Sequence, residues 1–203
     1  MMAGRSRSRR TAAFGLAGAI GILLLAGCGG EAPPSTTVDA CRMATERPEW
    51  FRAMARTEKQ WGVPVSVQLA TIARESSFVH DAQPMKTKGV WIFKRKVPRS
   101  SALGYAQALD GTWNEYVEKT GRRRADRTDF ADASDFIGWY MNTNARTNGV
   151  PLTDVYSQYL AYHEGRAGYA RGSYRQKGWL PDVARDVEAW AVRYEQQLQG
   201  CRG

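Results

Sequence analysis

Residues 63–78 restrict the fold of this chain more than any other segment. Their sequence, VPVSVQLATIARESSF, has the apolar pattern of a helix, and Pro64 suits the first position of that helix. Four of the apolar residues share one face: Val65, Leu69, Ile72 and Ala73. The helix ends in Glu75-Ser76, so a buried helix would carry one carboxyl group at its end.

A carboxyl group in this position has a specific chemical use. When packing keeps a carboxyl group away from water, the group retains its proton near neutral pH, and a general acid needs that property. Glu75 is therefore the first candidate for a catalytic residue. The same pattern also fits an ordinary solvated residue in a last helical turn, and this segment alone does not separate the two interpretations.

The N-terminus has the features of an export signal. Four arginines precede an apolar run at residues 14–26, which is shorter than the roughly 20 residues that a spanning helix needs. The run ends in Leu25-Ala26-Gly27-Cys28, which resembles the lipobox of bacterial lipoproteins. The resemblance implies a lipoprotein signal peptide at residues 1–27 and a lipid-anchored Cys28. An ordinary secretory signal, with Cys28 incidental, is the alternative.

The remainder of the chain divides into a tether and one domain. Residues 28–40 are rich in turn-forming residues and predict a flexible tether, and residues 41–203 provide enough chain for one domain with a core. Loss of residues 1–27 would lower the formal charge from +9 to +5. A basic surface suits nucleic acid, an anionic membrane or an anionic wall polymer, and export excludes nucleic acid. Gly29 favours sorting to the outer membrane, with the domain facing the periplasm, and we expect a monomer.

The cysteines and histidines limit the cross-links and metal sites. If Cys28 carries lipid, Cys41 and Cys201 remain at the two ends of the domain. An exported compartment permits a disulfide between them, worth about 2–5 kcal/mol, although two free thiols are the alternative. The two histidines, His80 and His163, have no neighbouring ligands at metal-binding spacing. We expect no metal and no cofactor.

Helical spacing dominates the predicted domain. It predicts helices at residues 48–61, 64–76, 113–120, 135–144, 153–162 and 181–199. Residues 89–93 resemble a strand, with the basic run Lys94-Arg95-Lys96 behind it. Most of the seven tryptophans lie at helical spacing, so we expect them in the core rather than against a sugar. The predicted fold class is a mainly α single domain with a small extended or hairpin insertion.

Three motifs follow one another along the domain. They are Glu75-Ser76, then Gly104-Tyr105-Ala106-Gln107 with Thr112-Trp113, then Ala161-Tyr162-His163-Glu164-Gly165. In this order they resemble the motifs of lytic transglycosylases in the goose-type lysozyme-like superfamily, over about residues 61–171. The resemblance implies a lysozyme-like domain of the SLT type, with peptidoglycan as substrate and Glu75 as the catalytic residue.

The resemblance also implies roles for other residues. Gln107 would hydrogen-bond the substrate or the catalytic carboxyl group, and Tyr162 would lie near Glu75 and orient it. Gly104 would let the sugar approach the backbone closely. Substrate contacts are also implied at three further motif positions: Ser76, Tyr105 and His163. A surface amide at Gln107 and a core aromatic ring at Tyr162 are the plainer interpretations.

Two features depart from the family pattern. His163-Glu164 replaces the usual asparagine-alanine pair, so the role of that asparagine does not transfer directly. The segment between Glu75 and Gly104 is longer than usual, and its additional residues 85–98 are basic and aromatic. This insertion could be a lid or a glycan-binding hairpin. The basic runs at residues 94–96 and 122–124 also fit simple solvated charge clusters.

The implied reaction needs one carboxyl group. Glu75 would protonate the β-1,4 glycosidic oxygen between N-acetylmuramic acid and N-acetylglucosamine, then accept the proton of the C6 hydroxyl, giving a 1,6-anhydro product. Most glycosidases instead use two carboxylates. A hydrolytic muramidase, with Glu164 or Asp110 directing a water, is therefore one alternative. A non-catalytic peptidoglycan-binding lipoprotein is the other.

Overall fold

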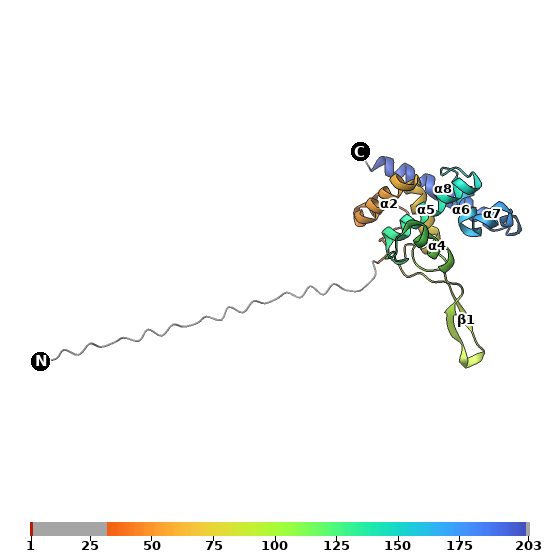
Figure 1. Ribbon diagram of the computed structural model, residues 1–203, viewed down its shortest axis with the longest axis horizontal. Helices are drawn as coiled ribbons and strands as arrows, with labels where there is room; N and C mark the ends of the chain where they lie inside the picture. The colour runs from red at the N-terminus through yellow and green to blue at the C-terminus, as the bar shows by residue number, and fades with distance from the viewer. Residues whose placement is uncertain (2–31, 202–203) are drawn as a thin grey trace.

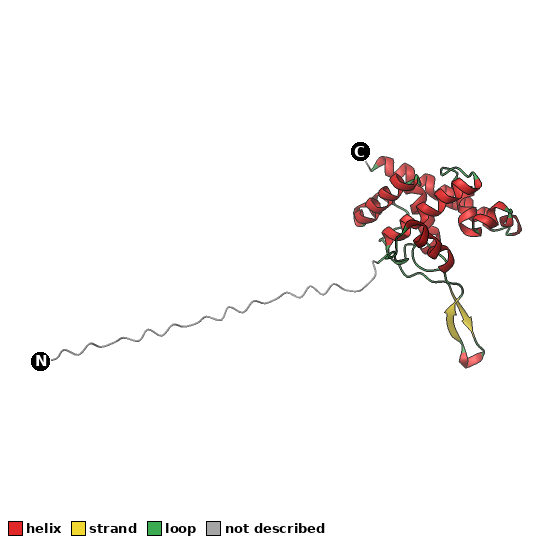
Figure 2. Cartoon of the chain, in the orientation of Figure 1, coloured by secondary structure: helices red, strands yellow, loops and turns green. Residues whose placement is uncertain are grey.

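In the part of the chain that the computed structural model describes, Met1 and residues 32–201, eight α-helices pack together and one hairpin projects from them (Figure 1). The mainly α, single-domain fold is thus confirmed, and helices account for most of the domain (Figure 2). The helices are α1 (Ala40–Glu46), α2 (Pro48–Trp61), α3 (Val65–Ser76), α4 (Asp110–Thr120), α5 (Phe130–Asn148), α6 (Val155–Glu164), α7 (Arg166–Ala170) and α8 (Leu180–Gly200).

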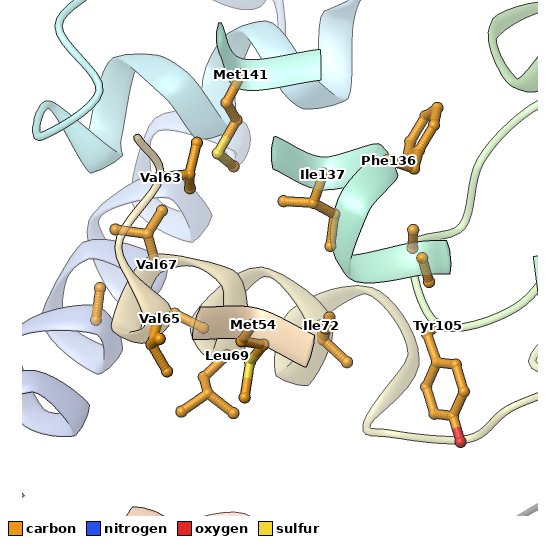
Figure 3. Close-up of a cluster of buried hydrophobic side chains, with 14 of the residues drawn as sticks. Met54, Val63, Val65, Val67, Leu69, Ile72, Tyr105, Phe136, Ile137 and Met141 are labelled. Carbon is orange, nitrogen blue, oxygen red and sulfur yellow. The ribbon is translucent and has the colours of Figure 1, made fainter. Parts of the chain in front are cut away.

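Helix α3 lies in the core, as its apolar sequence predicts. Every residue from Val65 to Ile72 is buried, and the helix packs along α8 on one side and against α2 and α5 on others. Figure 3 shows the α3 side chains among those of Met54 and Ile137. Because α3 is enclosed, its last turn is held in place by the packing of the whole domain. The helix ends at Ser76, and Ser77 caps it, since its left-handed backbone (φ 51°) lets its N–H donate to the carbonyl of Ala73.

Several helices differ from the sequence prediction in their bounds, and at the start of α5 a capping residue accounts for the difference. Helix α2 begins and ends where predicted. Helix α5 begins earlier, at Phe130, because the side chain of Asp129 accepts a hydrogen bond of 2.9 Å from the backbone N–H of Asp132. The short α1 and α7 were not predicted. Asp39 caps α1 in the same way.

The segment at residues 85–98 forms a hairpin of two antiparallel strands, β1 (Met85–Lys88) and β2 (Arg95–Pro98). The predicted strand at residues 89–93 is therefore wrong, because this apolar run forms the turn and contains the 3-10 helix η1 (Trp91–Phe93). Gly89 has a φ of +106°, and a β-carbon there would lie 2.3 Å from the carbonyl oxygen of Phe93. The chain can reverse at this point because residue 89 is glycine.

The two ends of the predicted domain, residues 41 and 201, meet at the C-terminal end of α8. A disulfide joins Cys41 to Cys201 across 160 residues, with the Cα atoms 5.7 Å apart. The described part of the predicted tether contacts the domain: the phenol of Tyr194 donates to the carbonyl of Thr37, and the Gln197 amide donates to that of Val38 at 3.0 Å. The predicted signal peptide and Cys28 lie outside the described residues. Within residues 32–201, no helix is long and apolar enough to cross a membrane.

Candidate active site

Glu75 lies in the last turn of α3 and faces α6. Its Oε1 accepts a hydrogen bond of 2.8 Å from the phenol of Tyr159, near the middle of that helix. The glutamate is partly buried, whereas Tyr159 is only 3% exposed. Two helices that are far apart in the sequence therefore fix the carboxyl group from opposite sides.

The surroundings of Glu75 favour its protonated form. Burial raises the pKa of Glu75 from its ordinary value of 4.5 to about 7, although the hydrogen bond from Tyr159 and the charge of Arg74 act in the opposite direction. Burial, followed by the charge of Glu75, also raises the pKa of Tyr159 well above 10, so the phenol keeps its proton and donates. A carboxyl group with this pKa can both give and take a proton near neutral pH.

Tyr162 lies one helical turn after Tyr159, on the same side of α6. Burial, and next the nearby charge of Glu75, raise the pKa of Tyr162 well above its ordinary value. Its phenol does not bond to the carboxyl group. It donates instead to the carbonyl of Ala106 at 2.6 Å, so its observed contact holds the second motif against α6.

The second motif forms a tight loop that the side chain of Gln107 closes. The amide nitrogen of Gln107 donates to the carbonyls of Ala82, at 2.7 Å, and Gly104, at 2.9 Å. The backbone N–H of Gly104 also donates to Ala82 at 2.9 Å. These bonds tie the loop to the segment that follows α3. The side-chain amide of Gln107 is thus engaged with the backbone, and no bond joins it to Glu75 among the described residues.

Three of the predicted substrate contacts have structural partners of their own. The space beside Gly104 (φ +79°) is occupied by the protein, since a β-carbon there would lie 1.9 Å from the carbonyl oxygen of Arg127. The backbone of Gly104 therefore approaches that of Arg127 closely. Tyr105 is 1% exposed and its ring packs in the core against Trp50 and Phe130. Ser76 is buried, and its hydroxyl donates to the carbonyl of Ile72 at 3.2 Å.

The third motif ends in a cluster around Glu164. Its Oε1 lies 2.6 Å from Nζ of Lys177 and 3.1 Å from Nδ1 of His163, while its Oε2 accepts from the hydroxyl of Ser173. Burial opposes ionisation, but the hydrogen bonds from Lys177, Ser173 and His163 outweigh it and lower the pKa of Glu164 to about 2. The nearby Arg166 forms no ion pair with Glu164. Arg166 binds Glu115 at 2.6 Å instead.

A pocket of about 160 Å³ joins the second and third motifs. Gln107, Tyr162 and His163 line it, and the ring of His163 also contacts Trp179 edge-on at 5.2 Å.

The profile of the transglycosylase SLT domain matches residues 16–201, which is most of the chain. The chain belongs to the transglycosylase SLT domain family. No curated protein matches it. Membership implies a transglycosylase that binds and degrades peptidoglycan.

Sequence reasoning missed one residue of this SLT domain that contacts the candidate acid directly. The sequence predicts Tyr159 only as part of a helix, and the family resemblance implies that Tyr162 orients Glu75. A signal was available, because Tyr159 and Tyr162 are three residues apart and must share a helix face. Which of the two reaches Glu75 depends on how α6 is rotated against α3.

Proposed function

We propose that this protein is a lytic transglycosylase that cleaves the β-1,4 bond between N-acetylmuramic acid and N-acetylglucosamine. Protonated Glu75 gives its proton to the glycosidic oxygen as the bond from that oxygen to C1 of the muramic acid breaks. The C6 hydroxyl of the same sugar then attacks C1, and the Glu75 carboxylate takes up the hydroxyl proton. The 1,6-anhydro ring forms without water, and Glu75 is protonated again.

The observation that carries this proposal is the placement of Glu75, which is partly buried at the end of α3 with its Oε1 held by Tyr159. With a pKa raised to about 7, the carboxyl group is an acid of suitable strength, and its conjugate base is strong enough to accept a proton from a hydroxyl. The bond from Tyr159 holds Oε1 in a fixed position, which is the requirement for repeated proton transfer.

The two alternative carboxylates are poorly suited to direct a water. Glu164, with a pKa of about 2, is a weak base, and hydrogen bonds occupy both of its oxygens. Asp110 is well exposed and forms an ion pair with Arg127 at 2.7 Å. These environments favour a mechanism with one carboxyl group over hydrolysis with two.

Digestion of isolated sacculi followed by mass spectrometry tests the proposal. The anhydro products are lighter by one water than the products of hydrolysis. Glu75→Gln keeps the shape of the side chain but removes the proton, so product release should fall by at least about 10²-fold. Glu118→Gln, on the exposed surface of α4, is the matched control and should retain activity. Hydrolytic products, or an unchanged rate in Glu75→Gln, would contradict the mechanism, and binding without any turnover would favour a non-catalytic role.

We also propose that lipid on Cys28 anchors the domain, with the protein at the outer membrane and facing the periplasm. The support is the Leu25-Ala26-Gly27-Cys28 motif. Each buried CH₂ of an acyl chain contributes about 0.8 kcal/mol, so the protein should fractionate with membranes and resist extraction by salt. Cys28→Ala should block lipidation and normal processing. Release of the native protein by salt alone would contradict the anchor.

A further inference from the structure

The hairpin of β1 and β2 extends away from the helical domain (Figures 1 and 2). Its turn carries three apolar side chains that are almost fully exposed: Val90 (76%), Trp91 (82%) and Phe93 (76%). The cost of exposing large apolar side chains to water makes such a group typical of an interaction surface. We call Val90, Trp91 and Phe93 the apolar tip.

Positive charge surrounds the apolar tip. Six basic residues lie on or next to the two strands, all exposed: Lys86, Lys88, Lys94, Arg95, Lys96 and Arg99. The sequence has no acid from residue 82 to residue 109, and no ion pair in the described part of the chain involves the six. Lys88 and Arg95 are direct partners across the strands. Like charges in that arrangement repel, so an anionic partner would relieve the repulsion.

We propose that the hairpin docks on an anionic lipid bilayer, with the apolar tip inserted among the headgroups and the basic residues bound to lipid phosphates. The projecting shape favours a bilayer over a glycan strand, because the hairpin extends away from the helices that carry the candidate active site. Aromatic rings at the end of an element with lysine and arginine behind them match the chemistry of a membrane interface. The proposal does not depend on the catalytic mechanism.

The base of the hairpin is fixed to the candidate active site, so docking would also orient that site. The backbone N–H of Arg99 donates to the carbonyl of Pro84 at 2.7 Å, which extends the strand pairing by one bond. Two residues earlier, the carbonyl of Ala82 accepts from Gly104 and Gln107 of the second motif. A hairpin anchored in the bilayer would therefore hold the second motif at a set distance from the membrane surface.

Quenching of Trp91 fluorescence by brominated lipids tests the docking. The full chain is mixed with vesicles of phosphatidylcholine, with or without phosphatidylglycerol, and the signal of Trp91 is the difference between the wild type and Trp91→Phe. We expect Trp91 to be quenched in the anionic vesicles and to lose that quenching in neutral vesicles or at high salt. The comparison holds whether or not the N-terminus carries lipid, because both proteins share it.

Two sets of variants separate the contributions of the tip and of the charges. Val90→Ser combined with Phe93→Ser, and separately Lys88→Gln combined with Arg95→Gln, should each abolish the quenching of Trp91. Arg123→Gln combined with Arg124→Gln, an exposed pair away from the hairpin, should preserve it. All of these variants should cleave soluble glycan strands at the wild-type rate.

Three outcomes would overturn the proposal. The first is no quenching of Trp91 in anionic vesicles, and the second is equal quenching in neutral ones. The third is a change in Trp91 emission on adding lipid-free sacculi, together with slower cleavage by the tip variant, which would assign the hairpin to glycan binding. None of these depends on Glu75, so a failure here would leave the proposed reaction intact.

Discussion

The phenol of Tyr159 donates a hydrogen bond of 2.8 Å to Oε1 of Glu75, and this bond links the end of α3 to the middle of α6. It opposes the effect of burial on the glutamate, because a donated hydrogen bond stabilises the carboxylate. The pKa of about 7 is the balance of burial, which raises it, against this bond and the charge of Arg74, which lower it. Tyr159 therefore controls both the position of the carboxyl group and the ease with which it loses its proton.

Tyr159→Phe removes the bond while keeping the ring. We expect the pKa of Glu75 to rise further, so the alkaline limb of the activity profile should move to higher pH, and the rate at the optimum should fall by about tenfold as the carboxyl group loses its fixed position. The profile of kcat/KM against pH measures both effects. Tyr156→Phe, on the same helix, is the control. An alkaline limb that stays in place would show that Tyr159 has no influence on the acid.

The raised pKa of Glu75 should make stability depend on pH in a defined direction. The pKa of this carboxyl group is near 4.5 in the unfolded chain and about 7 in the folded protein. The stability that it contributes to the fold is therefore fully present below pH 4.5 and is lost as the pH rises through about 7. Glu75→Gln should thus raise the free energy of unfolding at about pH 8, on the order of 2 kcal/mol, and change it little at about pH 4. Urea unfolding at both pH values measures the difference. A gain of equal size at both would contradict the assignment.

Glu164→Gln should lower the stability of the protein without changing the reaction that it catalyses. The ionised carboxylate binds Lys177 and Ser173, so its loss should lower the free energy of unfolding at neutral pH by about 1–3 kcal/mol. Because the pKa of Glu164 is lowered to about 2, the stability it contributes is present above 4.5 and lost as the pH falls toward 2. The product should remain the anhydro sugar. A switch in the product, or loss of all turnover in a folded variant, would restore Glu164 as a catalytic candidate.

Gly104→Ala should disrupt the second motif through the backbone. A β-carbon would meet the carbonyl oxygen of Arg127, and the positive φ disfavours any side chain. We expect a lower melting temperature and a clear loss of activity, measured by calorimetry and by product release. Gly111→Ala is the matched control, since its β-carbon would have no neighbour within 4 Å and alanine favours the helix. Equal stability of the two variants would contradict the close contact.

The disulfide between Cys41 and Cys201 should affect stability more than catalysis. It closes a very long loop, and its loss through Cys201→Ser should cost about 2–5 kcal/mol. Activity on sacculi at low temperature should persist, because Glu75 and Tyr159 lie elsewhere in the fold. Mass mapping without reduction checks the linkage in the exported protein, and finding both thiols free there would refute it.

The sequence predicts an element correctly where residues close to it in the chain determine its conformation, and incorrectly where distant residues do. Apolar spacing and a terminal proline and glycine are local, so α2 could be placed to the residue. The run at residues 89–93 is equally apolar but lies at a turn, because strand pairing on either side and the backbone of Gly89 decide its conformation. The exposure of Val90, Trp91 and Phe93 could not be predicted from the sequence either, since large apolar side chains are more often buried.

The sequence by itself determined that a mainly helical domain would form, that α3 would be buried, and that one glutamate would lie at its end. Those properties follow from the order of apolar and polar residues along single elements. Only the tertiary structure decided that Tyr159 rather than Tyr162 bonds to Glu75, that Arg127 fills the space beside Gly104, and that Lys177 neutralises Glu164. Each of these contacts joins residues from different segments, and the packing angle of two helices or the path of a loop sets the distance between them.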